Sequence, residues 1–293
     1  MGEFFALACA LAWAVAVILF RKAGLSVPPL ALNLFRVTVS SGLFLLTLAA
    51  TGHPLLHVAP LGDYLILAAS GVVAIALSDT LFHMSLNRVG AGVNAVVDSL
   101  YSPFVVLFAF LMLSERLGPQ ELAGMVLIVS AVILSTQVRP PQGTNRRELV
   151  TGVVIGVAAM ASLAFGIVLA KPVIERNDVV WSTTVRQLGA LAALAPAALI
   201  APGRRRTWSV FRPRAVWRVS LPGTVMGSYL ALLLWIGGMK YTEAGIASIL
   251  NQTSTIYILI LATVVLHEPF TRRKTIAAVM AVAGAVLVLG PGF

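Results

Sequence analysis

Long apolar stretches separated by short polar segments cover the chain from end to end. Ten stretches stand out, and each is close to the ~20 residues that an α-helix needs to cross a bilayer. The pattern therefore predicts an all-α polytopic membrane protein with ten transmembrane helices. We expect the helices at about residues 3–20, 30–50, 62–86, 92–113, 119–137, 149–170, 180–200, 215–238, 245–266 and 274–290.

The fourth and ninth stretches are related in sequence. Residues 91–117 align with residues 244–270 at a shift of 153 positions, without a gap. Both segments begin with small residues and carry a polar patch one to two turns later. Each then continues as an apolar run that ends at a glutamate, Glu115 or Glu268. Polar residues at matching places in duplicated apolar segments are typical of transporters.

The duplication extends to the rest of the chain. Arg36 and Arg186, each early in its apolar stretch, match at a shift of 150 positions. Because each copy has five spans, an odd number, the second copy has to cross the membrane in the opposite direction to the first. We therefore expect two inverted five-helix repeats around a central cavity. The polar, proline-containing segment between them predicts a first repeat at 1–138, a linker loop at 139–148 and a second repeat at 149–293.

Composition supports the membrane class. The chain is 59% hydrophobic and 11% charged, whereas an ordinary soluble domain is about 25% charged. A net charge of +10 would suggest a nucleic-acid partner in a soluble protein. Here the basic residues occupy short loops, so we expect contact with the lipid bilayer and no nucleic acid. The single cysteine, Cys9, lies inside an apolar stretch and is expected to pack there.

The basic residues also predict an orientation. Fifteen Lys and Arg side chains fall in one set of loops, while the other set holds only Arg116, Lys171, Arg176 and Lys240. Because positively charged loops stay in the cytoplasm, both termini should face outward from the bacterial inner membrane. Residues 1–3 supply no basic n-region, so we expect the first apolar stretch to be a span and not a signal peptide.

Ionisable residues inside the spans need an explanation, because each costs at least ~2.5 kcal/mol at the bilayer centre. Asp98 and its repeat partner Asn251 suit a substrate ammonium or a proton site, and their alternative role is helix packing or capping. Asp79 and His83 share one helical face at i and i+4. Together with Asp98 they are candidates for proton coupling. Their alternative role is a mutual hydrogen bond within a seam between helices.

Arg36 and Arg186 each present a fork of donors that can hold a carboxylate. Both lie within about two turns of a span end, where long side chains reach the interface, so we expect a gating or structural role. Pro103 can bend its span and free a carbonyl group beside a cavity. Glu115 and Glu268 lie at tight turns and are expected to pair with neighbouring arginines.

Aromatic, amide and hydroxyl side chains predict the substrate cavity. Trp13, Tyr101 and Tyr257 lie about ten residues from either span end, where the polar atom of a Tyr or Trp needs a partner. Interfacial belts and helix–helix packing are the alternative explanations for these residue types. The expected substrate-binding residues are Trp13, His83, Asn94, Asp98, Ser99, Tyr101, Ser102, Phe165, Tyr229, Trp235, Asn251, Gln252, Ser254 and Tyr257.

Several motifs of catalysis and energy coupling are missing from the sequence. No GxxxxGK(S/T) loop supports ATP-driven transport. No HExxH, GxSxG or Cys/His cluster supports an enzyme or a metal site. We therefore expect no enzymatic activity, no cofactor and no metal.

Three features together point to a known family. They are Trp13 within ALAWA, the Arg36 and Arg186 pair, and the span ends LSERLGPQELAGMVLIVSAVIL and LHEPFTRRKTIAAVMAVAGAVLVL. With them, nearly the whole chain resembles the ten-span EamA-type exporters of the drug/metabolite transporter superfamily. The second copy departs from the pattern at Leu163, which stands opposite Trp13. The resemblance implies a single-chain, basket-like bundle with a central cavity, which exports amino acids, related metabolites or small drugs without ATP.

The sequence thus predicts a secondary transporter that exports small amphipathic metabolites by alternating access, with aromatic or aliphatic amino acids as the first candidates. Alternatives of the same fold are an uptake permease and a multidrug or lipid-linked metabolite carrier. A non-transporting membrane scaffold is the alternative from another class, although paired polar patches at membrane depth count against it. The substrate, the coupling ion and the oligomeric state stay open, with a monomer as the simplest working unit.

Overall fold

The computed structural model describes the chain over seven ranges, in which every regular element is a helix. Within them, seven helical stretches are long and apolar enough to cross a membrane, and shorter apolar helices occur at Leu122–Ser135 and Leu250–Leu266. The protein is therefore a multi-pass helical membrane protein, while the expected total of ten spans stays a prediction. The described ranges are residues 1–52, 54–56, 59–113, 118–136, 145–212, 215–241 and 250–289.

Prolines and glycines set helix boundaries in the first half. Pro28 and Pro29 begin the second helix, because proline suits a first turn, where its missing N–H would have no partner. Gly90, with φ 81°, separates the third helical stretch from the fourth. The elements are α1 (Gly2–Gly24), α2 (Pro29–Ala50), α3 (Leu61–Gly71), η1 (Val72–Leu77), α4 (Ser78–Val89), α5 (Ala91–Asp98), α6 (Tyr101–Leu113) and α7 (Pro119–Thr136).

The second half begins with a capped helix. The Asn145 side chain accepts from the Glu148 N–H, and the Glu148 carboxylate accepts from the Asn145 N–H, so the two form a capping box. Residues 146–148 of the expected linker therefore belong to a helix, and residues 139–144 lie outside the described ranges. The elements are α8 (Arg146–Arg176), α9 (Val179–Ile200), α10 (Arg204–Trp208), η2 (Ser209–Phe211), α11 (Trp217–Thr224), η3 (Val225–Leu230), α12 (Ala231–Tyr241), α14 (Ser254–Leu266) and α15 (Arg272–Leu289).

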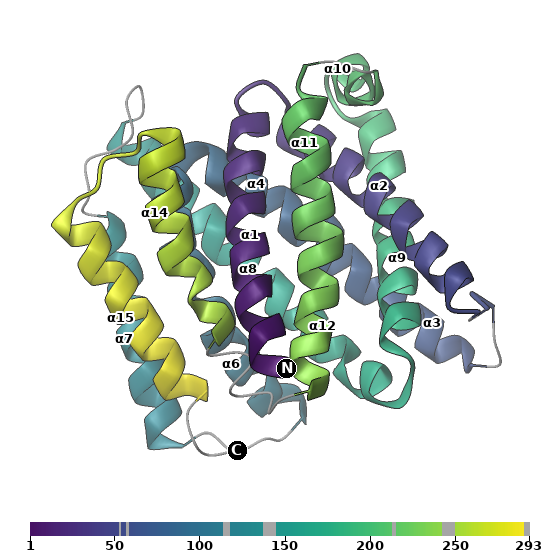
Figure 1. Ribbon diagram of the computed structural model, residues 1–293, viewed down its shortest axis with the longest axis horizontal. Helices are drawn as coiled ribbons and strands as arrows, with labels where there is room; N and C mark the ends of the chain where they lie inside the picture. Colours follow the sequence, from purple (N-terminus) through teal and green to yellow (C-terminus); the bar gives the residue numbers. More distant parts are fainter. Residues whose placement is uncertain are drawn as a thin grey trace.

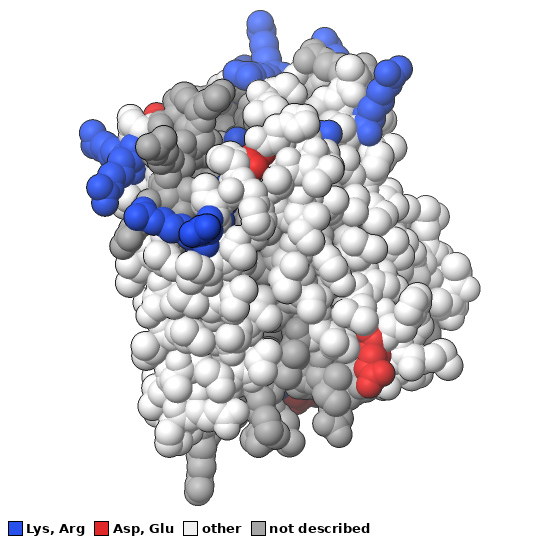
Figure 2. All heavy atoms as spheres, turned by 60° about the vertical axis from the view of Figure 1, so that its left-hand side comes forward, with Lys and Arg blue, Asp and Glu red and all other residues white. Residues whose placement is uncertain are grey.

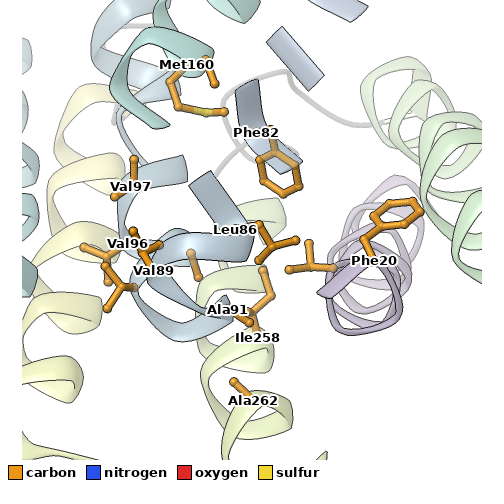
Figure 3. Packing of buried hydrophobic residues seen from close by; sticks show 14 of the residues in the cluster. Phe20, Phe82, Leu86, Val89, Ala91, Val96, Val97, Met160, Ile258 and Ala262 are labelled. Atoms are coloured by element: carbon orange, nitrogen blue, oxygen red, sulfur yellow. The ribbon is translucent and has the colours of Figure 1, made fainter. Parts of the chain in front are cut away.

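Helices of the two halves pack against each other in pairs (Figure 1). α1 lies along α12, α2 along α9, α4 along α8 and α7 along α15. Buried apolar side chains from α1, α4, α5, α8 and α14 converge in one cluster, which includes Phe20, Phe82 and Ile258 (Figure 3). The main hydrophobic core therefore joins the two halves of the chain.

The surface divides into apolar sides and charged ends. Large apolar side chains such as Leu46, Leu111 and Val126 are exposed on the outside of the bundle, where lipid would surround them. Figure 2 shows many lysine and arginine side chains gathered towards one end of the molecule and a largely uncharged face below them. This distribution suits a bilayer, and the side of the membrane that the basic end faces stays a prediction.

Each half contains two irregular helical segments at matching positions. η1 follows α3 and η3 follows α11, both as π-helical stretches of six residues that are related by a shift of 153 positions. A second interruption separates α5 from α6 at Ser99–Leu100 and recurs before α14 at Thr253. π-helical turns occur frequently at functional sites, and discontinuous membrane helices mark binding sites in carriers. These four irregular segments therefore indicate a candidate binding site between the two halves.

Candidate functional site: a cavity between the two halves

A cavity of about 290 Å³ lies between the two halves of the chain. Both halves build its wall, because α1, α2, η1, α4, α5 and α6 contribute from the first and α8, α9, η3, α12 and α14 from the second. The lining residues are Cys9, Trp13, Arg36, Ala74, Ile75, Asp79, Phe82, Asp98, Tyr101, Met160, Leu163, Ile167, Thr183, Arg186, Gln187, Gly227, Ser228, Ala231, Leu232, Trp235, Asn251, Gln252 and Ser254.

Many lining residues form pairs that are related by the sequence repeat. Trp13 and Leu163 are related by a shift of 150 positions, as are Arg36 and Arg186. The remaining pairs are related by a shift of 153, and equivalent positions of the two copies therefore build the site even where the side chains differ. These pairs are Ala74 with Gly227, Ile75 with Ser228, Asp79 with Leu232, Phe82 with Trp235, Asp98 with Asn251 and Tyr101 with Ser254.

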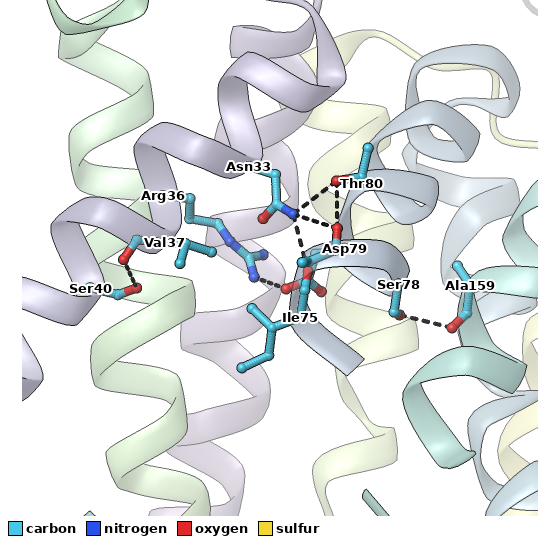
Figure 4. Close-up of polar contacts among 10 residues, drawn as sticks. Asn33, Arg36, Val37, Ser40, Ile75, Ser78, Asp79, Thr80 and Ala159 are labelled. Carbon is cyan, nitrogen blue, oxygen red and sulfur yellow. Dashed lines mark hydrogen bonds and ion pairs between the residues drawn. The ribbon is translucent and has the colours of Figure 1, made fainter. Parts of the chain in front are cut away.

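Arg36 has its charge balanced inside the first half. Its guanidinium forms an ion pair with the Asp79 carboxylate, and Figure 4 shows the two side chains pointing at each other from α2 and α4. Arg36 is only 5% exposed, and its guanidinium carbon lies 5.5 Å from the centre of the Phe20 ring. The sequence led us to expect that this side chain reaches the membrane interface. It lines a buried cavity instead.

Arg186 occupies the equivalent position on α9, where it forms no ion pair with a carboxylate in the described part of the chain. The residue that corresponds to Asp79 in the second half is Leu232, which cannot form an ion pair. In the described ranges, the one hydrogen bond of the Arg186 side chain runs from Nε to Ser70 Oγ at 3.0 Å. Arg186 is 7% exposed and lines the cavity. Its two terminal nitrogens are therefore available to an acidic group in the cavity.

Asp98 supplies a carboxylate at the break between α5 and α6. Oδ1 accepts a hydrogen bond from Asn94 Nδ2 at 3.2 Å, and Oδ2 has no partner among the described residues. The repeat partner Asn251 also lines the cavity, and its buried Oδ1 likewise lacks a partner in the described part of the chain. Because buried polar atoms in proteins are normally hydrogen-bonded, both side chains are available as acceptors to a bound donor.

The rest of the wall is largely apolar and aromatic. Trp13 packs against Phe82 with ring centroids 5.8 Å apart, and Trp235 lines the cavity from α12. Met160, Leu163 and Ile167 add an aliphatic strip from α8. Within the described ranges, no group of three or more His, Cys, Asp or Glu side chains is arranged to hold a metal ion. The cavity thus combines an apolar body with a few charged and amide groups.

Half of the expected substrate-binding residues line this cavity. They are Trp13, Asp98, Tyr101, Trp235, Asn251, Gln252 and Ser254. Gln252 also connects the halves, because its Nε2 donates to Ser102 Oγ at 3.0 Å. Pro103, the third residue of α6, is buried. It lacks the N–H that would bond the Ser99 carbonyl in a continuous helix, so its position agrees with the break at Ser99–Leu100.

The other expected substrate-binding residues do not line the cavity. Phe165 is 36% exposed and packs edge-on against Phe108 at 5.5 Å, which places it on the outer surface of the bundle. The Tyr229 hydroxyl instead forms a hydrogen bond with Thr47 Oγ1 at 2.6 Å. Ser99 donates to the carbonyl of Val96 within its own turn. The residues outside the wall are His83, Asn94, Ser99, Ser102, Phe165, Tyr229 and Tyr257.

His83 lies beside the cavity wall, directly after Phe82. Its ring packs edge-on against Phe20 at 5.1 Å and Phe82 at 5.4 Å. Asp79, which we considered as its hydrogen-bond partner, pairs with Arg36 instead. Neither imidazole nitrogen of His83 has a partner in the described ranges. A role for His83 in proton coupling stays a prediction.

Three polar lining residues were missing from the sequence-based expectation. They are Thr183 and Gln187, which flank Arg186 on α9, and Ser228 on η3. Gln187 Oε1 and Ser228 Oγ are buried without a partner among the described residues. The sequence repeat could have identified Ser228 as a lining residue. Ser228 is equivalent to Ile75, which lies four residues before Asp79. Cys9, expected only to pack, lines the cavity and donates from Sγ to the Ala231 carbonyl at 3.1 Å.

Glu268 joins the two halves at the basic end of the molecule. Its carboxylate accepts hydrogen bonds from the N–H groups of Ala91 at 2.7 Å and Gly92 at 3.1 Å, so it caps the start of α5. It also pairs with Lys274 Nζ at 3.2 Å. The expected pairing of Glu268 with Arg272 and Arg273 stays a prediction. Glu115 lies outside the described ranges.

Comparisons with known proteins agree with this fold. One of eighteen matching chains of solved structures, described as a crystal structure of a protein, is 18% identical with a TM-score of 0.69. The match covers 98% of this chain and 95% of that chain. A search of curated proteins found no match. The model of the EamA-like transporter family matches residues 1–137 and again residues 150–290. Both halves are thus accounted for, and the chain belongs to the EamA-like transporter family of membrane transporters.

Proposed function

We propose that the protein is a secondary transporter that exports small zwitterionic metabolites with an apolar body across the bacterial inner membrane. Aromatic or aliphatic α-amino acids are the first candidates. One observation carries the proposal: the cavity contains the Arg186 guanidinium and the Asp98 carboxylate, and neither has an ion-pair partner among the described residues. An α-amino acid supplies the complementary pair of charges, a carboxylate for Arg186 and an ammonium for Asp98.

The energetics of buried charge favour a ligand that carries both signs. A buried ion without a partner is destabilised by several kcal/mol relative to water. A zwitterion neutralises Arg186 and Asp98 together, whereas a ligand with a single charge leaves one of them unbalanced. The transporter should therefore discriminate against amines that lack a carboxylate and against acids that lack an amine.

The size and the wall of the cavity support the same substrate class. Its volume of about 290 Å³ lies at the lower end of the roughly 300–1,000 Å³ typical of small-molecule sites. Trp13, Phe82 and Trp235 offer aromatic surface for an apolar side chain.

We propose further that the two halves act as inverted repeats, and that they move relative to each other so that the cavity opens to each side in turn.

Counterflow in proteoliposomes tests the proposal. The purified protein is expected to exchange labelled L-phenylalanine, and unlabelled L-phenylalanine should compete at least about tenfold better than phenethylamine or 3-phenylpropionate, since each analogue leaves one charge unpaired. Arg186→Gln should narrow the discrimination against phenethylamine, and Asp98→Asn should narrow the discrimination against 3-phenylpropionate. Arg206→Gln, which changes an exposed arginine on α10, serves as the matched control.

Two results would contradict the proposal. Absence of saturable flux for every amino acid tested would remove the substrate class. Equal competition by all three compounds would remove the two-charge site. Direction is tested separately in membrane vesicles of known sidedness, where accumulation in inside-out vesicles supports export and accumulation only in right-side-out vesicles indicates an uptake permease.

A further inference from the structure

Asn33 lies behind the cavity wall and makes an uncommon set of contacts. Its Nδ2 donates to the carbonyls of Ile75 at 3.0 Å and Ala76 at 3.1 Å, and to Thr80 Oγ1 at 3.0 Å (Figure 4). Asn33 is fully buried on α2. The two hydrogens of one amide group are thus shared among three acceptors, which all belong to a single stretch of chain.

These acceptors are available because the stretch is not a regular α-helix. Ile75 and Ala76 belong to η1, which is π-helical from Val72 to Leu77. In a π-helical turn the hydrogen bonds span five residues instead of four, so the segment holds an additional residue and its carbonyls leave the α-helical pattern. Thr80 Oγ1 also donates to the Ala76 carbonyl, at 2.7 Å. Asn33 and Thr80 therefore supply side-chain donors where the backbone pattern changes.

The register of η1 determines where the following side chains point. An α-helix turns by about 100° per residue, so loss of the additional residue would rotate the chain after η1 by about that angle relative to α3. The residues that follow include Asp79 and Phe82, which both line the cavity. Ile75 lines it from within η1. A regular α-helix here would direct these side chains away from their present positions.

Helix α2 holds this segment at two points. Asn33 bonds the backbone of η1, and Arg36, three residues further on the same face of α2, bonds the Asp79 carboxylate. Figure 4 shows both side chains extending from α2 towards η1 and α4. In the second half the equivalent of Asn33 is Thr183, which lines the cavity instead. The two-point attachment therefore belongs to the half that carries the Arg36–Asp79 pair.

We propose that Asn33 is a positioning residue for substrate binding, which fixes the π-helical register of η1 and so keeps Asp79 paired with Arg36 in the cavity wall. Arg186 then remains without an ion-pair partner among the described residues. The inference rests on the proposed function, because it takes the cavity as the substrate site. Asn33 acts through Asp79 and Ile75 and has no place in the cavity wall itself.

A thiol-labelling experiment tests the register without any need for transport. In a Cys9→Ser background, Ile75→Cys reports on η1, and Leu163→Cys reports on the α8 wall of the same cavity. Adding Asn33→Ala should slow methanethiosulfonate labelling at position 75 by at least about fivefold, because the side chain turns out of the cavity, and should leave position 163 unchanged. Asn33→Ser keeps one donor and should give an intermediate rate.

Ser40→Ala provides the matched control on the same helix. Ser40 is fully buried, and among the described residues its Oγ donates to the Val37 carbonyl of its own helix and to no other group. The substitution should leave both labelling rates unchanged. Equal slowing at positions 75 and 163 in Asn33→Ala would show a general loss of structure and overturn the proposal. Unchanged labelling at both positions would also overturn it.

Counterflow adds the functional readout. Asn33→Ala should raise the KM for L-phenylalanine about tenfold, with a smaller effect on the maximal rate. The double variant Asn33→Ala, Asp79→Asn should have nearly the same KM as Asp79→Asn alone, because both residues act in one hydrogen-bond network. A KM equal to that of the wild type would overturn the positioning role. If labelling responds at position 75 alone while the wild-type protein moves no amino acid, the register role is supported and the proposed substrate class fails.

Discussion

The contact between Glu268 and the start of α5 is the most direct place to perturb the attachment of the two halves. Glu268 follows α14 in the second half, and it caps the N–H groups of Ala91 and Gly92 in the first. Gly90 fits this arrangement because it has a positive φ, and a Cβ there would lie 2.7 Å from Glu268 Oε1. Glu268→Ala removes all of these contacts without changing the cavity wall.

The expected magnitude follows from the bonds that are lost. A hydrogen bond to a charged group contributes about 1.5–3 kcal/mol, and loss of a helix N-cap costs about 0.5–2 kcal/mol. Water can replace part of the contact once the end opens, so we take about 2 kcal/mol as the net effect on closure of this end. Since about 1.4 kcal/mol corresponds to a tenfold change, the population in which the basic end is open should rise about 30-fold.

Thiol labelling by a reagent added at the basic end of the molecule measures the population in which this end is open. Val96→Cys, in a Cys9→Ser background, places a thiol on α5 between the Glu268 contact and Asp98, at a position that is 1% exposed. Its labelling by a charged, membrane-impermeant thiol reagent should accelerate about 30-fold in Glu268→Ala if labelling follows the open population. Glu148→Ala is the control, since Glu148 also caps a helix but does so within its own helix α8. Equal labelling rates in wild type and Glu268→Ala would refute the reasoning, and so would the same acceleration in Glu148→Ala.

Three further substitutions test separate parts of the structure. Gly71→Ala should lower the midpoint of thermal unfolding by several degrees, or about 1–3 kcal/mol, because a Cβ at this position overlaps the Arg186 carbonyl between α3 and α9. A midpoint equal to that of the wild type would contradict this close approach. Asp98→Asn should abolish flux driven by a pH gradient if Asp98 carries the proton, whereas gradient-driven flux at the wild-type rate would remove that role. Phe165→Ala should leave the KM for L-phenylalanine unchanged while Trp13→Ala raises it several-fold, and the reverse order in counterflow would show that the cavity is misassigned.

The sequence predicted the helices well because their lengths follow from the thickness of the bilayer. The expected span at 119–137 corresponds to α7, and the expected span at 30–50 corresponds to α2. The π-helical register of η1 and η3 could not be predicted, because no residue pattern distinguishes bonds that span five residues from bonds that span four. In η1, the Asn33 side chain hydrogen-bonds the displaced carbonyls from another helix, and such a tertiary contact cannot be read from the local sequence.

Several expected residues that lie outside the cavity wall are one or two positions away from a residue that lines it. The sequence predicts the aromatic Tyr229 in the cavity, but its neighbour Ser228 on η3 lines the cavity. The sequence also predicts Phe165 in the cavity, but Leu163, two residues earlier on α8, lines it. Adjacent helical residues point about 100° apart, so a shift of one or two positions moves a side chain from the cavity to another face. Leu163 and Ser228 are the strict repeat partners of Trp13 and Ile75, which shows that repeat register was a better guide than residue type.

The differences between the repeats matter as much as their similarity. Both carboxylates of the cavity, Asp79 and Asp98, come from the first half, while the arginines are divided between the halves. Arg36 pairs with Asp79 inside the first half. The remaining charged groups of the cavity are the Asp98 carboxylate in the first half and the Arg186 guanidinium in the second half. A zwitterion that binds Asp98 and Arg186 would bridge the two halves, so it would favour the closed arrangement of the cavity more than a ligand that contacts one half alone. Under the proposed mechanism, selectivity in transport should therefore exceed selectivity in binding, because a compound with a single charge can occupy the cavity without drawing the halves together.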